Sequence, residues 1–367
     1  MKKISFKLIF AILCISIVPV IYSSLFLGAL MDPYGKVSHL PVAVVASENN
    51  SVLKSIETNK LFDLKHETNT KAEKDLENGN VYAILKFDNE FNNDLHQFPV
   101  QHKHPTITMV TSEGLGYTTT KILKNTMTQF VAKANLELGQ KIPILPTTNS
   151  PKLNNANILA LKNVEKHPVK NNGTSLAPYF FSLTSFVGCI VISQFILQAI
   201  SKKKVSLKKY WIIEFLIPFI ISIVQVALLL GANHYFIKIQ IDQPILIIPF
   251  FILVSATFIS IIVALNKLIP GLGALIVLLL TMLQTSSSGG TYAIQLSGHL
   301  FKTINAFLPM TYSIDGFKKL ISLNSTNLSH DSLILVGFFL VGQLILLLAY
   351  YKHEYRQTKK EISTNAK

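Results

Sequence analysis

The chain has 367 residues, of which 49% are hydrophobic and only 15% are charged, and its mean hydropathy is +0.40. These values are typical of integral membrane proteins and exclude an ordinary soluble enzyme. The formal net charge of +14 does not predict a nucleic-acid partner, because the lysines stand beside apolar runs rather than on one soluble face.

The first predicted element is a charge-free apolar run over residues 8–31, preceded by Lys2, Lys3 and Lys7. The run exceeds both the roughly 20 residues that cross a bilayer and the roughly 7–15 of a signal-peptide core. We therefore expect residues 1–31 to form a short cytoplasmic N-terminus and a retained first transmembrane helix. A cleaved signal peptide is the alternative.

A mixed polar segment follows over residues 32–177 and is long enough for one domain and its linker. Three β-rich runs lie at residues 40–47, 81–87 and 106–112. Two helical patterns lie at residues 70–79, where Gly79 is the expected stop, and 118–138. These patterns predict an α+β domain. Several Pro and Asn residues indicate a linker over residues 143–172.

Five further apolar runs predict the remaining membrane spans, at residues 176–200, 215–237, 244–265, 268–285 and 333–351. Only Asn266 and Lys267 separate the third of these runs from the fourth, and a single helix across both would be over about 60 Å long. We therefore expect a tight turn at Pro270, Gly271 and Gly273. The predicted fold is a polytopic α-helical membrane protein with six transmembrane helices and an α+β extracellular domain between the first and second.

Basic residues predict the orientation of these spans. With six spans, the lysine groups at residues 2–7, 202–209, 267 and 352–360 fall on one face, which the positive-inside rule makes cytoplasmic. Both termini are then cytoplasmic, including a tail over residues 352–367. Residues 32–177 are extracellular, and residues 178–351 form a five-helix membrane domain of the cell membrane.

The loop over residues 286–322 is predicted to be an extracellular re-entrant or amphipathic cap on this membrane domain. After a Ser/Gly-rich start it carries two amphipathic helical patterns, one containing Phe301 and Phe307 and the other Phe317. The residues expected to shape the cap are Gly289, Gly290, Tyr292, Pro309, Tyr312, Asp315 and Gly316. Pro309 is expected to divide the cap, and Asp315 and Gly316 to open its second half. The cap either gates a path or seals the bundle.

No catalytic, cofactor-binding or metal-binding constellation is visible in the sequence. It lacks G-x-x-x-x-G-K-[ST], H-E-x-x-H and paired-cysteine patterns. His102 and His104 flank Lys103 and are interpreted as surface histidines rather than metal ligands. A membrane enzyme is a weak hypothesis, because no nucleophile has a base at a suitable spacing.

Polar residues inside the predicted spans are candidates for a substrate path. They are Gln194, Gln198, Gln225, Gln284 and Gln343. Gln194 and Gln198 are four residues apart and share one helical face. These amides either line a path for an amphipathic substrate or join neighbouring helices by hydrogen bonds, and the second interpretation is the more frequent one.

A charged cluster precedes the third predicted span and consists of Lys202, Lys203, Lys204, Lys208, Lys209 and Glu214. Such lysines first of all set topology, and their second role here would be a coupling surface for a cytoplasmic ATPase. Glu214 either pairs with Lys208 or Lys209 or contacts that partner.

Three separated stretches carry a family resemblance. They are MDPYGKVSHLPVAVVAS at residues 31–47, GTSLAPYFFSLTSFVG at 173–188 and SSSGGTYAIQLSGHLFKTINAFLPMTYSIDGFKKLIS at 286–322. With their order of one span, an outer domain and five spans, they resemble the YhgE/Pip family of Gram-positive membrane proteins, which belongs with the type-2 ABC exporter permeases.

This resemblance implies the permease subunit of an ABC-type exporter that moves an amphipathic or lipid-like compound or peptide out of the cell. It also implies separate cytoplasmic ABC ATPase subunits that bind the ATP, and a homodimer or a heterodimer with a related permease in the lipid bilayer. The alternative is a surface scaffold or receptor, such as a phage-infection protein or a secretion-machine component, without transport of its own.

Overall fold

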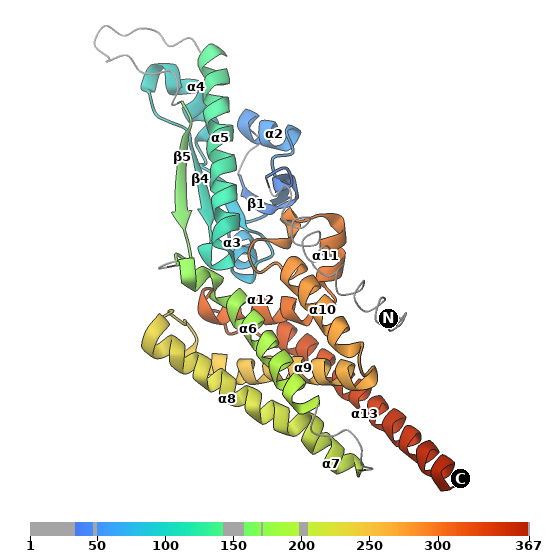
Figure 1. Cartoon of the computed structure of the whole chain (residues 1–367). Helices are drawn as coiled ribbons and strands as arrows, with labels where there is room; N and C mark the ends of the chain where they lie inside the picture. The colour runs from blue at the N-terminus through green and yellow to red at the C-terminus, as the bar shows by residue number, and fades with distance from the viewer. Residues whose placement is uncertain (1–33, 47–49, 142–157, 170–171, 198–204, 366–367) are drawn as a thin grey trace, which may run out of the picture. The chain divides into compact units, whose positions relative to one another are not determined.

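The computed structural model describes residues 34–46, 50–141, 158–169, 172–197 and 205–365. The predicted first span lies outside the described residues, as do Gln198, Lys202, Lys203 and Lys204. The described chain forms two compact units (Figure 1). The sheet unit comprises Asp32–Ser175 together with the short segment Thr291–Leu296, and the helical unit comprises Leu176–Gly290 and Ser297–Lys367.

The sheet unit is built on a mixed sheet of strand order β2-β1-β3-β4-β5. Its strands are β1 Pro41–Val45, β2 Asp63–His66, β3 Ala83–Phe87, β4 Thr106–Thr111 and β5 Ala160–Glu165. Only the β3–β4 pair is antiparallel among these strands, with Ala83 opposite Thr111. β1 and β3 are buried on both faces, because their apolar runs suit central strands that helices cover from both sides.

Helices surround this sheet. They are α2 Ser51–Thr58, α3 Asn69–Asn78, α4 Phe91–Gln101 and α5 Tyr117–Lys141. Asn50 caps α2, because its Oδ1 accepts a hydrogen bond from Leu53 N at 2.7 Å. Gly79 follows α3 with φ +76°, a left-handed conformation that glycine adopts without strain, so the predicted helix stop is confirmed.

The sequence located β1, β3, β4, α3 and α5 in this unit but missed β2, β5, α2 and α4. The linker predicted over residues 143–172 is therefore wrong in part, since β5 lies within it and pairs with β4 along its whole length. β5 is half-exposed and carries Lys162 and Asn163 in its centre, so no apolar alternation marks it as a strand.

The helical unit contains the apolar helices. They are α6 Asn172–Leu197, α7 Leu207–Trp211, the π-helical turn η4 Ile212–Leu216, α8 Ile217–Ala232, the π-helical turn η5 Asn233–Ile237, α9 Pro244–Leu268, α10 Gly273–Ser287, α11 His299–Asn305, α12 Pro309–Ile321 and α13 Ser329–Asn365. Four segments of the described chain are long and apolar enough to cross a membrane: Gly173–Gln194, Leu207–Ile237, Pro244–Leu268 and Ser329–Tyr355. α10 is apolar but shorter, so the described residues show four of the six predicted spans.

The tight turn predicted after Lys267 is present. α9 ends at Leu268 and α10 begins at Gly273, with Gly271 at φ +90° between them. A Cβ on Gly273 would lie 2.5 Å from Asn266 Cα, so only glycine allows the two helices to approach this closely.

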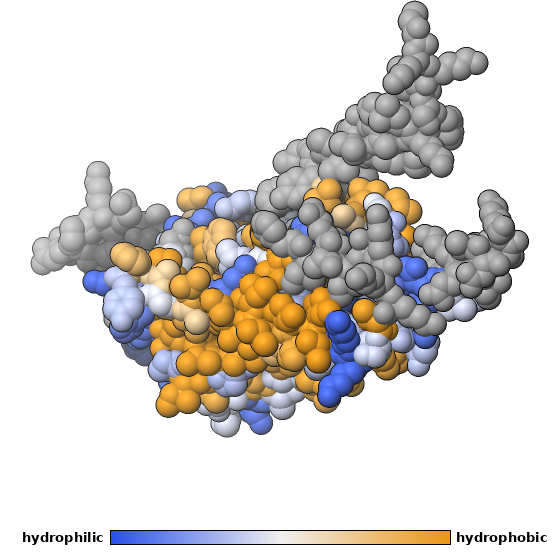
Figure 2. Space-filling model, turned by 60° about the horizontal axis from the view of Figure 1, so that its bottom comes forward, coloured by the Kyte–Doolittle hydropathy of each residue, from blue (hydrophilic) through white to orange (hydrophobic). Residues whose placement is uncertain are grey.

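Aromatic side chains form much of the core of the helical unit. Phe317 of α12 lies 4.4 Å from Phe251 and 5.1 Å from Phe250, both on α9, between ring centroids. Phe186 of α6 packs edge-on against Phe258 of α9 at 5.1 Å. The outside is also apolar, with Ile220 and Leu228 of α8 among the exposed side chains. Figure 2 shows a broad hydrophobic surface on one face, as a lipid-facing protein requires.

The two helices of the region predicted as a cap differ in burial. In α12 the predicted apolar face, including Ile314 and Phe317, is fully buried, whereas Phe307 after α11 is 73% exposed. α12 starts at Pro309 and runs without a break to Ile321, so Asp315 and Gly316 lie inside a helix and do not open a second half. Of the three residues expected to divide or open the cap, Pro309, Asp315 and Gly316, only Pro309 begins a helix.

Candidate functional site

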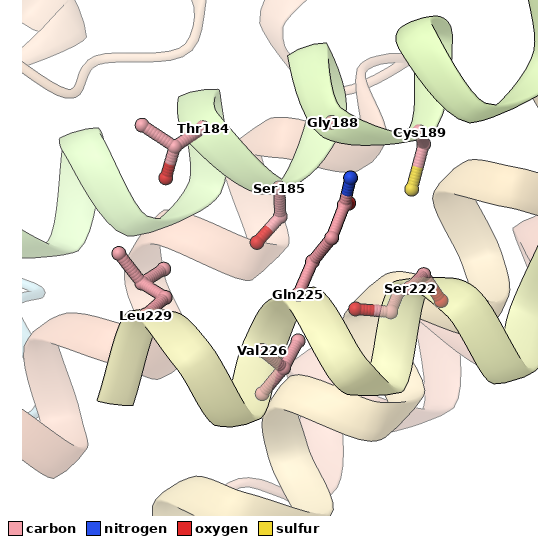
Figure 3. A pocket seen from close by; sticks show the side chains of 9 residues that line it. Thr184, Ser185, Gly188, Cys189, Ser222, Gln225, Val226 and Leu229 are labelled. Carbon is pink, nitrogen blue, oxygen red and sulfur yellow. The ribbon is translucent and has the colours of Figure 1, made fainter. Parts of the chain in front are cut away.

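A polar cavity of about 210 Å³ lies between α6 and α8 in the helical unit (Figure 3). Its walls are formed by Thr184, Ser185, Gly188 and Cys189 of α6, Ser222, Gln225, Val226 and Leu229 of α8, and Ser255 of α9. These are mostly small side chains, which let membrane helices approach while placing hydroxyl groups between them. The cavity therefore offers polar groups inside spans that are otherwise apolar.

Gln225 is the longest polar side chain at this cavity. Figure 3 shows it reaching from α8 across the cavity toward Gly188 on α6. A Cβ on Gly188 would lie 2.5 Å from Gln225 Oε1, so the missing side chain at residue 188 provides the space that the amide occupies. The amide can both donate and accept hydrogen bonds at this position.

The hydroxyl groups of the cavity differ in what they bind. Thr184 and Ser222 each donate to a backbone carbonyl of their own helix, those of Phe180 and Phe219, both at 2.7 Å. Ser185 Oγ is buried and has no hydrogen-bond partner among the described residues. A buried hydroxyl without a partner costs about 1–3 kcal/mol, and Ser185 can offer one hydrogen bond to a group that enters the cavity.

The other predicted path glutamines that the structure describes do not gather at this cavity. Gln194 is exposed at the end of α6. Gln343 joins helices, because its Oε1 accepts from Trp211 Nε1 at 2.8 Å and its Nε2 donates to Ser260 Oγ at 2.9 Å. Gln284 is fully buried and accepts from Met310 N at 3.1 Å, at the start of α12. Hydrogen bonding between elements thus describes Gln284 and Gln343 better than a shared path.

The cap residues are held by close packing and hydrogen bonds. Gly289 has φ +71°, and a Cβ on Gly290 would lie 2.2 Å from the Tyr179 ring of α6. Tyr312 Oη donates to Ala306 O at 2.8 Å, and Asp315 is half-exposed, 3.8 Å from Lys318 Nζ. Gly316 lies against Phe250, where a Cβ would be 2.1 Å from the ring. The cap is therefore closely packed around Gly290 and Gly316.

The segment Thr291–Leu296 of the cap belongs to the sheet unit. Ala293 N donates to Thr119 Oγ1 at 2.9 Å, and Tyr82 Oη donates to Gln295 Oε1 at 3.1 Å. Leu296 is fully buried and Tyr292 is 8% exposed. The chain thus leaves the helical unit after Gly290, forms part of the sheet unit and returns at Ser297.

Glu214 is not on the surface predicted for ATPase coupling. Its side chain is fully buried in η4, and its Oε1 accepts from Lys267 Nζ, on α9, at 2.7 Å. Lys208 and Lys209 are exposed and do not pair with it, so the alternative in which Glu214 pairs with one of these lysines is wrong. Glu214 Oε2 has no hydrogen-bond partner within the described part of the chain.

Three residues of the helical unit were not predicted from the sequence as part of a site or pair. Lys267 was interpreted only as a topology signal, although its position between two apolar runs also marks it as a cation at a helix end. Asp331 of α13, 2% exposed, accepts from Lys319 Nζ of α12 at 2.7 Å. Ser185 gave no signal, because serine is common in membrane helices.

Comparison with known proteins adds a family match over nearly the whole chain. The family model described as "ABC-2 family transporter protein" matches residues 9–350. The uncharacterized protein YhgE of Bacillus subtilis (strain 168) is 30% identical over 157 residues. That alignment covers 42% of this chain and 20% of the relative, so the chain spans a minor part of the relative's length. No solved structure matches the chain.

Proposed function

Because the chain belongs to the ABC-2 transporter family, we propose that it is the membrane permease subunit of an ABC-type exporter. In this proposal it carries an amphipathic or lipid-like compound or peptide out of a Gram-positive bacterium. Separate cytoplasmic ATPase subunits supply the energy, and two permeases form the membrane part, either as a homodimer or with a related chain. Six spans and an extracellular sheet unit belong to the same proposal.

The observation that carries the proposal is the polar cavity between α6 and α8. An apolar bundle gains no stability from a buried hydroxyl that lacks a partner, as at Ser185. A cargo with a polar group and an apolar body would satisfy this hydroxyl and the Gln225 amide while it stays within the apolar spans. The described residues thus fit an amphipathic cargo better than a strongly charged one.

Movement of the two walls would change this cavity. α6 and α8 flank the lysine cluster, whose described members Lys208 and Lys209 are exposed directly before η4. A cytoplasmic subunit that binds these lysines would pull on the start of the Leu207–Ile237 span. The buried pair of Glu214 and Lys267 would pass that displacement to α9.

The proposal is tested by survival of cells that lack the gene, with and without the protein supplied in trans. The cells are challenged with a cationic detergent, an anionic bile salt and an amphipathic antimicrobial peptide. We expect the deletion to lower resistance to at least one of them, and the wild-type chain to restore it. Unchanged resistance to all three, together with no associated ATPase, would reject the exporter.

A receptor or scaffold is the second candidate, and a groove in the sheet unit favours it. The groove is about 240 Å³ and lies between α2 and α5, with Asn59, Phe130 and Lys133 among its walls. Exchange of residues 32–175 for the matching domain of a relative tests this candidate. Altered phage adsorption with unchanged resistance to the three compounds would support it over export.

A further inference from the structure

A second cavity, of about 420 Å³, lies at the other end of α8, where η5 ends and α9 begins. The two flanking segments, Leu207–Ile237 and Pro244–Leu268, are both candidate membrane spans. A connection of six residues between two spans lies at the boundary of membrane and water, whichever side of the membrane it faces. The cavity is therefore placed at the level of lipid headgroups.

The backbone at this boundary is held in an unusual conformation. Lys238 has φ +57°, a left-handed conformation that is unfavourable for a residue with a side chain. Asn233 is 4% exposed and holds the turn through both backbone groups of Ile239, because its Oδ1 accepts from Ile239 N at 3.2 Å and its Nδ2 donates to Ile239 O at 3.3 Å. The fold thus keeps Lys238 at the rim of the cavity at a cost in backbone energy.

The ionisable side chains that line the cavity are all basic. His234 and Lys238 line it, and its described lining contains no carboxylate. Neither residue has an ion-pair partner within the ranges that the structure describes, and the nearby Asp242 carboxylate accepts a hydrogen bond from Gln240 Nε2 at 3.3 Å. A cation without a partner beside a membrane complements the phosphate of a lipid headgroup.

The rest of the cavity is apolar. Ile241, Ile247 and Ile248 form part of its lining, and Ile248 is 50% exposed. Next to the cavity, Tyr235 and Phe236 are 72% and 84% exposed, as aromatic side chains are at a membrane interface. An occupant therefore needs both an anionic head and an apolar tail.

We propose that this cavity binds an anionic phospholipid, with its headgroup phosphate at Lys238 and His234 and an acyl chain along Ile247 and Ile248. The site is distinct from the cavity between α6 and α8, and it does not depend on export. A phospholipid held here would fix the connection between α8 and α9 relative to the bilayer.

The purified full-length chain is placed in nanodiscs that contain equal amounts of phosphatidylglycerol and phosphatidylcholine. The test measures which of the two lipids stays bound to the chain when the nanodisc is dissolved. The wild-type chain is expected to retain phosphatidylglycerol preferentially, and Lys238→Gln to lower that preference about fivefold. Lys60→Gln is the matched control, because Lys60 is also exposed and also has a positive φ, of 47°, but lies between α2 and β2 in the sheet unit, outside every candidate membrane span. It should leave the preference unchanged.

Two further measurements distinguish a loss of lipid binding from a loss of folded protein, and a phospholipid site from a site for free phosphate. Lys238→Gly removes the charge and also relieves the left-handed strain, so it should lower the preference without loss of folded protein. Inorganic phosphate at millimolar concentration should not displace the lipid. Equal retention of both lipids, equal effects of the Lys60 and Lys238 variants, or full displacement by phosphate would each overturn the proposal.

Discussion

Gly188 of α6 lies directly against Gln225 of α8, so that a Cβ on residue 188 would stand 2.5 Å from Gln225 Oε1 and 3.3 Å from its Cδ. This contact defines one wall of the polar cavity, because the amide occupies the space that a side chain on α6 would take (Figure 3). Replacement of Gly188 by a larger residue should therefore fill the cavity without removing a polar side chain.

Gly188→Leu is expected to displace the Gln225 amide and fill the cavity. Resistance to the compound that the wild-type chain exports should fall about tenfold or more, since loss of one polar contact with the cargo is worth about 1.4 kcal/mol. Gly337→Leu is the matched control, because nothing lies within 4 Å of a Cβ at that position in α13. Equal resistance of both variants, at equal amounts in the membrane, would contradict a cargo site here.

Gly290→Ala is expected to destabilise the cap. The added methyl group would lie 2.2 Å from the Tyr179 ring, and overpacking of this kind costs about 1–3 kcal/mol. Thermal unfolding of the detergent-solubilised chain should show a lower midpoint, which Tyr179→Leu in the same chain should partly restore. If Gly290→Ala abolishes resistance while the protein inserts normally, the cap gates the path; if resistance follows stability alone, it seals the bundle.

Lys267→Met is expected to lower the free energy of unfolding by about 3–5 kcal/mol, because it leaves the buried Glu214 carboxylate without its counter-ion. Glu214→Gln in the same chain should recover part of this loss, since the amide needs no counter-ion. Lys208→Met removes an exposed lysine and should change stability by no more than about 0.5 kcal/mol. Denaturant unfolding in detergent measures all three, and additive effects of the two buried substitutions would show that the pair is not coupled.

Thr119→Val is expected to loosen the segment Thr291–Leu296 without emptying the space around it. Valine has nearly the shape of threonine but cannot accept the hydrogen bond from Ala293 N. Hydrogen exchange at the Ala293 amide should accelerate about fivefold or more, as one lost hydrogen bond of about 1 kcal/mol predicts. Thr128→Val, which removes a hydroxyl bonded to its own helix in α5, is the control and should leave this amide unchanged.

The sequence predicted elements whose hydrophobic pattern is strong in itself. β1 is a continuous apolar run, β3 is apolar except for Lys86, and Gly79 and Gly271 stand where the chain needs a left-handed turn. β5 could not be predicted, because its pairing with β4 comes from the backbone and not from its half-exposed side chains. The pattern of a strand at the edge of a sheet is too weak to distinguish it from a linker.

The candidate site was predictable only in part. Gln225 stood out as an amide in an apolar run, yet the same signal selected Gln284 and Gln343, which bind other elements. Spacing along one helix does not show which helix will face it, so the contact of Gln225 with Gly188 needed the tertiary structure. For the same reason, Lys267 could not be recognised as the partner of Glu214.

The central claim is that this chain is a permease that works with separate ATPase subunits. Its most direct test is isolation of the tagged full-length chain from membranes of the cell that naturally makes it, with identification of the bound proteins by mass spectrometry. We expect an ABC ATPase in stoichiometric amount, lost after Lys208→Glu with Lys209→Glu and retained after Lys60→Glu, which reverses the charge of an exposed lysine in the sheet unit. Recovery of the intact chain without any nucleotide-binding subunit would contradict it.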